Sequence, residues 1–124
     1  MDRSDRDHVA CARLIETATE PLIVPAPVVV ELDWFAAARL GSSAFPAFLD
    51  DIEERRLEVL ELVAGDYRRV RDLIARYGDL PLGFVDAAVL SVAERLREPK
   101  VMTLDHRHFG VVRPRHVPRL RLLP

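Results

Sequence analysis

Three acidic residues interrupt segments of the chain that are otherwise apolar. Glu31, Asp86 and Asp105 lie in or directly after the runs VVVEL, FVDAAV and VMTLD. Burying an unpaired carboxylate costs several kcal/mol, and carboxylates that converge also repel one another. A divalent cation held between them removes both costs, because carboxylate oxygens are the ligands that such hard cations prefer. The residue types therefore suggest a metal site.

Two of these carboxylates lie on predicted helices, close to the side that each helix would bury. The apolar spacing predicts a helix over 28–40, with Glu31 at the edge of its apolar stripe. A second helix is predicted over 84–97, and Asp86 lies in its first turn, next to the apolar stripe. Helical geometry therefore places each carboxylate where it could face the interior.

The third carboxylate, Asp105, follows a compact strand predicted over 100–104. In open α/β sheets, ligands bind outside the carboxyl ends of the strands, which is where this residue should lie. Each acidic residue also has a purely structural interpretation. Asp86 could interact with the helix dipole, Glu31 could pair with Arg39, and Asp105 could start a turn. Spacing alone leaves both interpretations open.

The remaining elements predict an α/β fold, in one domain over residues 1–124. Strands separated by helices favour a mostly parallel sheet, and here a helix, not a strand, precedes the first strand. His106 and His108, on either side of Arg107 at the edge of the site, could contact phosphate, but we interpret them as turn residues. Further helices are expected from Asp5 or Asp7 to about Thr17, over 44–55 and over 66–77, and further strands over 21–25, 57–62 and 119–123.

Composition and charge narrow the class of protein. With 49% hydrophobic and 31% charged residues the chain is ordinary globular material, and no apolar run approaches the ~20 residues of a membrane span. The single cysteine, Cys11, excludes an internal disulfide and a cysteine-based zinc site. We expect a cytoplasmic protein. After Asp105 five arginines follow without an acidic residue, which suits either a polyanionic substrate or a solvated tail.

Three segments resemble the PIN-domain ribonucleases, closely those of VapC toxins: PAPVVVEL at 25–32, LPLGFVDAAV at 80–89 and MTLDHRHF at 102–109. The resemblance covers essentially the whole chain. It implies a PIN-like parallel sheet flanked by helices and an endoribonuclease that uses Mg²⁺ or Mn²⁺. The family's acidic cluster maps onto Glu31, Asp86 and Asp105, as catalytic residues and metal ligands.

The same resemblance implies the partners of the protein. The substrate would be RNA of the tRNA or rRNA class, and we expect Thr103, Arg107 and Arg113 to contact it. A cognate VapB-like antitoxin would neutralise the enzyme, and the chain would form a homodimer without any membrane association.

The chain departs from the family at its N-terminus. VapC proteins open with a strand of the form apolar-apolar-Asp-Thr/Ser, and neither this first, central strand nor its Asp has a counterpart here. Its loss would open the sheet in the middle and leave backbone groups unpaired. A start site further upstream, a strand supplied by another chain, and a decayed gene are the competing explanations. We expect weak or absent nuclease activity from the chain as it stands.

Two other classes of function compete with the nuclease. A catalytically impaired PIN domain could act only as a module that binds an antitoxin or another partner. A DNA-directed or flap-type nuclease is the second alternative, although the small size and the lack of a helical arch argue against it. A flavodoxin-like binding domain is disfavoured because the sequence has no glycine-rich phosphate loop.

Overall fold

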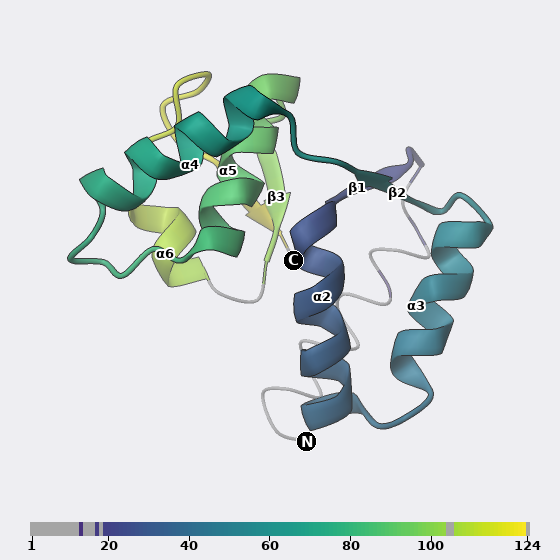
Figure 1. The fold of residues 1–124 in the computed structure, drawn as a ribbon. Coiled ribbons are helices and arrows are strands. Elements are labelled where there is room, and N and C mark those ends of the chain that lie inside the picture. Colours follow the sequence, from purple (N-terminus) through teal and green to yellow (C-terminus); the bar gives the residue numbers. More distant parts are fainter. Residues whose placement is uncertain (1–12, 14–16, 18, 104–105, 124) are drawn as a thin grey trace. The chain divides into compact units, whose positions relative to one another are not determined.

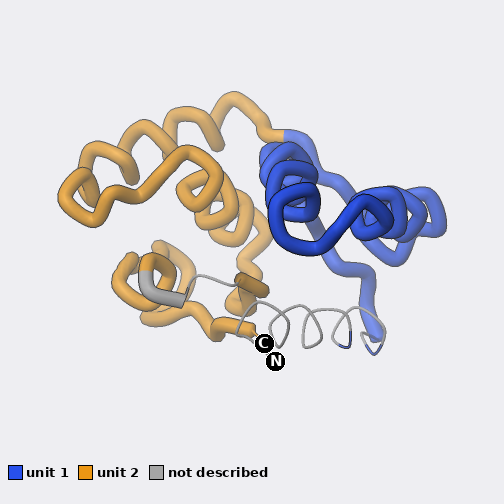
Figure 2. The backbone as a smooth tube through the Cα atoms, turned by 90° about the horizontal axis from the view of Figure 1, so that it is seen from below, with its two compact units in different colours: residues 1–61 blue, residues 62–124 orange. Residues whose placement is uncertain are grey.

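The chain forms two compact units, Met1–Glu61 and Leu62–Pro124, shown in different colours in Figure 2. The computed structural model describes residues 13, 17, 19–103 and 106–123, and for residues 106 and 107 it describes the backbone alone. No described helix is both long and apolar enough to cross a membrane.

Unit 1 is built from two parallel strands and the helices that connect them (Figure 1). Leu22 on the first strand is opposite Leu57 on the second. The interior contains Leu57, which is 2% exposed, together with Val24 and Ala36. Its elements are β1 (Leu22–Pro25), α2 (Ala26–Phe35), the π-helical turn η1 (Ala36–Leu40), α3 (Ala44–Glu53) and β2 (Leu57–Leu60).

Proline and glycine set the bounds of the long helical segment in unit 1. Pro27 lies in the first turn of α2, where its missing N–H leaves no hydrogen bond unmade. The segment ends at Gly41, whose φ of 92° favours a residue without a Cβ. Its amide donates to the carbonyl of Ala36 at 3.0 Å, which closes the wide last turn. The helix expected over 28–40 is therefore confirmed, with a π-helical end.

The described residues of unit 2 form three helices and a second pair of parallel strands. Val101 is opposite Leu122, and the amide of Thr103 donates to the carbonyl of Leu123 at 2.8 Å just beyond the paired residues. The elements of this unit are α4 (Ala64–Arg76), α5 (Phe84–Leu96), β3 (Lys100–Met102), α6 (His106–Val111) and β4 (Arg121–Leu123).

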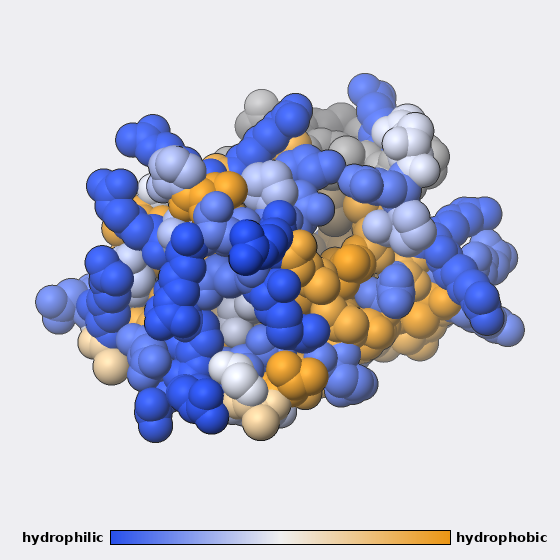
Figure 3. All heavy atoms as spheres, turned by 90° about the horizontal axis from the view of Figure 1, so that it is seen from above, coloured by the Kyte–Doolittle hydropathy of each residue, from blue (hydrophilic) through white to orange (hydrophobic). Residues whose placement is uncertain are grey.

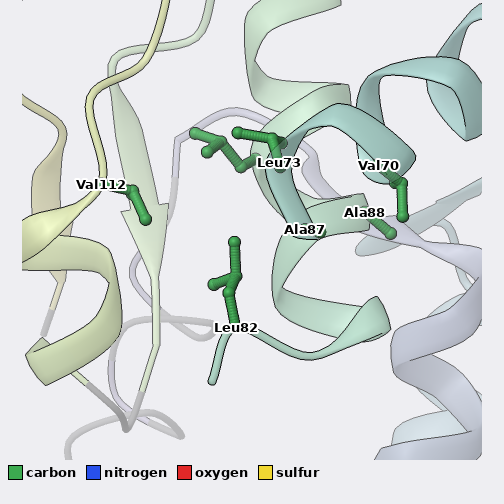
Figure 4. Packing of buried hydrophobic residues seen from close by; sticks show 7 residues of the cluster. Val70, Leu73, Leu82, Ala87, Ala88 and Val112 are labelled. Atoms are coloured by element: carbon green, nitrogen blue, oxygen red, sulfur yellow. The ribbon is translucent and has the colours of Figure 1, made fainter. Parts of the chain in front are cut away.

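The core of unit 2 lies where α4 packs on α5 (Figure 4). Leu73 and Leu90 have no exposed surface, and burying each side chain contributes roughly 1.5–3 kcal/mol. The small side chains of Ala87 and Ala88, both fully buried, occupy the α5 side of this cluster. The cluster is completed by Val70, Leu82 and Val112.

The structure confirms the α/β class and the parallel pairing of the strands. In the described part of the chain the four strands form two separate sheets, β1–β2 and β3–β4. The first, central strand that the family resemblance implies is not among the described residues. Most of the first predicted helix also lies outside that range, although Arg13 and Thr17 are helical and the Thr17 hydroxyl donates to the Arg13 carbonyl at 2.8 Å.

The segment after Asp105 differs from the prediction. His106 and His108 were interpreted as turn residues, and that was wrong, because residues 106–111 form α6. A six-residue helix containing Gly110 has little stability of its own. Phe109 supplies the reason for it, since this side chain is 3% exposed and packs in a cluster with Ala93 and Val101. Tertiary packing therefore makes this helix.

Candidate functional site

Asp86 is the sequence-predicted carboxylate whose surroundings are best defined. It is the third residue of α5, and Gly83 precedes that helix. The side chain is 27% exposed, and its Oδ2 lies 3.2 Å from Nδ1 of His108 on α6. A negative charge in the first turn of a helix is stabilised by the helix dipole. The carboxylate is therefore held on a rigid element and remains accessible to solvent.

The sequence placed His108 at the edge of the site but did not identify it as the partner of Asp86. Its side chain is 13% exposed, and Nδ1 donates to the Asp86 carboxylate when that nitrogen carries the proton. A hydrogen bond of this kind fixes the orientation of a carboxylate, which is the usual role of partners that surround metal-binding side chains. No spacing within 106–111 indicated this contact, because the two partners lie on different helices.

The other two predicted acidic residues lie outside the described part of unit 2. Glu31 is exposed on α2 in unit 1, beside a half-buried side that carries Val28 and Leu32. Asp105 lies outside the described range. Within that range, no three His, Cys, Asp or Glu side chains gather in a way that could hold a metal ion. The three-carboxylate site therefore stays a prediction.

The residues predicted to contact RNA all belong to unit 2. Thr103 is half-buried directly after β3. Arg107 lies in α6, where only its backbone is described. Arg113 is exposed, and its amide donates to the hydroxyl of Tyr77 at 2.9 Å. Their role in binding RNA therefore stays a prediction.

A buried carboxylate that the sequence did not single out lies between α4 and α5. The side chain of Asp66 is 3% exposed. It accepts hydrogen bonds from the Val63 amide at 2.9 Å and the Ser91 hydroxyl at 3.0 Å. The Arg95 guanidinium donates to it through Nε at 3.2 Å and Nη2 at 3.0 Å. One carboxylate thus caps the start of α4 and ties it to α5. The available signal was the position of Asp66 at the start of the helix predicted over 66–77, where an acidic side chain is favoured.

A second ion pair joins the same two helices. Arg69 donates to Glu94 through two nitrogens, at 2.7 and 2.9 Å, and the two side chains are 11% and 9% exposed. The Arg115 amide adds a third donor to Glu94 at 2.8 Å. This bidentate arrangement is the geometry in which guanidinium and carboxylate interact most strongly.

These contacts shift the pKa values of both carboxyls downward. Burial by itself raises the pKa of Asp66, but the hydrogen bonds from Arg95, Val63 and Ser91 outweigh it. Burial likewise raises the pKa of Glu94, and the donors Arg69 and Arg115 lower it further than burial raises it. The Glu94 carboxylate in turn raises the pKa of Arg69. All of these groups are therefore charged at neutral pH.

The chain belongs to the PIN-domain family. The family model described as PIN domain matches residues 1–113, which include all of unit 1 and most of unit 2.

A ribonuclease from Mycobacterium tuberculosis, Ribonuclease VapC26, is 32% identical to the chain over 124 residues, which is 100% of the chain and 92% of that protein. The family resemblance that the motifs indicated is thereby confirmed, and the chain is a VapC-type PIN protein.

Proposed function

We propose that the protein is an endoribonuclease toxin that requires Mg²⁺ or Mn²⁺, with Glu31, Asp86 and Asp105 as its metal-binding and catalytic carboxylates. The observation that carries the proposal is the position of Asp86. A half-exposed carboxylate at the start of α5, held by His108, belongs to a chain of the PIN family. The similarity of the chain to a ribonuclease supports RNA as the substrate.

The donor set suits a small, hard cation, because all three side chains offer carboxylate oxygens. When bound, such a cation lowers the pKa of water and neutralises charge on phosphate oxygens. Asp86 holds its place through the helix and through His108, so its oxygens do not have to reorganise as a ligand arrives. Thr103, Arg107 and Arg113 supply the hydroxyl and guanidinium donors for the RNA backbone.

The partners follow from the same family relationship. We expect the substrate to be an RNA of the tRNA or rRNA class. A VapB-like antitoxin would neutralise the enzyme, and the chain would act as a homodimer. The RNA class is measured by sequencing of cut ends, and the antitoxin and the dimer are measured independently of cleavage, by co-purification and by the mass of the particle in solution.

The test compares the chain with Asp86→Asn and with the control Asp79→Asn. Asp79 is an exposed aspartate in the loop after α4, so the control makes the same chemical change elsewhere in unit 2. We expect weak but measurable Mg²⁺-dependent cleavage of single-stranded RNA by the chain, and the same rate from Asp79→Asn. Asp86→Asn should be at least about 100-fold slower, because one charged ligand is lost.

Direct titration with Mn²⁺ separates the metal site from the activity. Asp86→Asn should bind Mn²⁺ more weakly than Asp79→Asn. If the chain binds an antitoxin but neither binds Mn²⁺ nor cuts RNA, the enzyme proposal fails and a partner-binding module takes its place. Equal cleavage by both variants would show that Asp86 is not one of the catalytic carboxylates.

A further inference from the structure

Unit 2 carries a surface groove that the predicted carboxylate site does not use. The groove has a volume of about 370 Å³, and it lies over the contact between the start of α4 and the end of α5. Figure 3, which views the molecule from the α4 side of unit 2, shows a mainly hydrophilic surface there. Four arginines line the groove: Arg69, Arg95, Arg97 and Arg115.

The charges of the groove do not cancel. Two carboxylates, Asp66 and Glu94, line it as well, and each is engaged by an arginine of the opposite helix. Arg97 and Arg115 are exposed and form no ion pair with the described residues. With His116 neutral, four arginines against two carboxylates leave a net charge of +2 in the groove. Such a surface attracts an anion.

The backbone fixes where these two free guanidinium groups start. Arg97 adopts a left-handed conformation with φ of 55°, and its amide donates to the carbonyl of Glu94 at 3.1 Å as α5 ends. The amide of Arg115 donates to the Glu94 carboxylate at 2.8 Å. The backbones of both arginines are therefore tied to Glu94.

We propose that this groove binds phosphate groups of an RNA backbone and so forms a second RNA contact, away from the carboxylate site. The proposal rests on the proposed ribonuclease function. Arginine suits phosphate because its planar fork donates two parallel hydrogen bonds. The paired arginines Arg69 and Arg95 contribute positive potential, while Arg97 and Arg115 have donors left for the ligand.

The position of the groove determines which RNA it would select. Asp86 and Arg95 lie on the same helix, about 14 Å apart along its axis and on opposite sides of it. An oligonucleotide bound at Asp86 must extend around the end of α5 to reach the groove. Short RNA therefore contacts the carboxylate site alone, and a longer, folded RNA contacts both. The groove makes the enzyme favour structured RNA over short fragments.

The test removes the two free charges in Arg97→Gln/Arg115→Gln. The control is Arg68→Gln/Arg71→Gln, which neutralises two exposed arginines on α4 that do not line the groove. Binding is measured by fluorescence anisotropy with a chelator present, so that no RNA is cut. For a stem-loop of about 25 nucleotides we expect about tenfold weaker binding by the groove variant, and a salt dependence reduced by about 1–2 in slope.

Cleavage with Mg²⁺ gives the second measurement. The groove variant should show a raised KM for the stem-loop with kcat unchanged, and normal cleavage of a tetranucleotide. The control should behave as the unmodified chain does with both substrates, and both variants should keep its urea midpoint. Equal stem-loop binding by groove variant and control overturns the proposal.

Three further outcomes separate the alternatives. Submillimolar binding of inorganic phosphate that depends on Arg97 and Arg115 would replace RNA by a small anion as the ligand. Stem-loop binding that depends on these arginines, in a chain that cuts no RNA, would support the RNA-binding groove and contradict the nuclease function. Cleavage that depends on Asp86 but not on the arginines would support the nuclease function and contradict the RNA-binding groove.

Discussion

Asp66→Asn tests whether the buried carboxylate between α4 and α5 stabilises unit 2. The substitution keeps the shape of the side chain and removes its charge. One amide oxygen can still accept from Val63, but the new NH₂ group faces the donors of Arg95 or Ser91. A hydrogen bond to a charged group contributes about 1.5–3 kcal/mol. Because the Arg95 side chain is 32% exposed and regains water, we expect a total loss of about 2–3 kcal/mol.

The measurement is equilibrium unfolding in urea, followed by far-ultraviolet circular dichroism. A loss of this size should lower the midpoint by about 1–2 M. The control is Asp72→Asn, which breaks the exposed 3.3 Å pair with Arg71 and should cost no more than about 0.5 kcal/mol. Arg95→Gln should destabilise as well, because it leaves a carboxylate only 3% exposed without its cation.

A double substitution checks that the two effects share one contact. Asp66→Asn combined with Arg95→Gln should cost less than the two single losses added together. If Asp66→Asn moves the midpoint no further than Asp72→Asn does, the reasoning that this buried network stabilises the unit is refuted.

Three further predictions follow from the same geometry. The folded-state pKa values of Asp66 and Glu94 lie below their ordinary 3.8 and 4.5. The stability that the two carboxylates contribute is therefore complete above about pH 4.5 and is lost as the pH falls through the folded-state pKa values. Measuring the urea midpoint at decreasing pH should show this loss, and Asp66→Asn should show less of it. Leu73→Ala should cost about 3 kcal/mol, because the side chain is fully buried; Ile74→Ala, at a 38% exposed neighbour, is the control in the same urea assay, and equal losses would contradict the packing. His108→Ala should raise the Mg²⁺ concentration for half-maximal cleavage about tenfold; His108→Asn, whose amide can replace Nδ1, should recover part of the loss, and an unchanged Mg²⁺ requirement would exclude a positioning role.

Most of the helices and strands were predictable from local pattern. The apolar spacing of α4 and α5 predicted helices that the structure contains at 64–76 and 84–96, and the proline-bounded run before Pro25 predicted β1. The exception is α6, whose sequence carries two histidines and a glycine. No local preference favours a helix there, so only the burial of Phe109 explains it.

The candidate site was predictable in a different way. The residue types and the three motifs indicated the family, which the comparison over residues 1–113 confirmed, and they placed Asp86 at the start of its helix. They did not indicate its partner. His108 is 22 residues further along the chain, and a contact between two elements has no signature within either of them.

The three carboxylates and their motifs therefore determined what class of protein this is, because they depend on residue types and on spacings within single elements. The tertiary structure decided which groups meet. It set His108 against Asp86 and buried Asp66 beneath Arg95. It also gathered Arg97 and Arg115 around Glu94 in one groove. The physical reason is that hydrogen bonds and ion pairs act over a few ångströms in space, and only the packing of helices brings residues this far apart in the chain within that range.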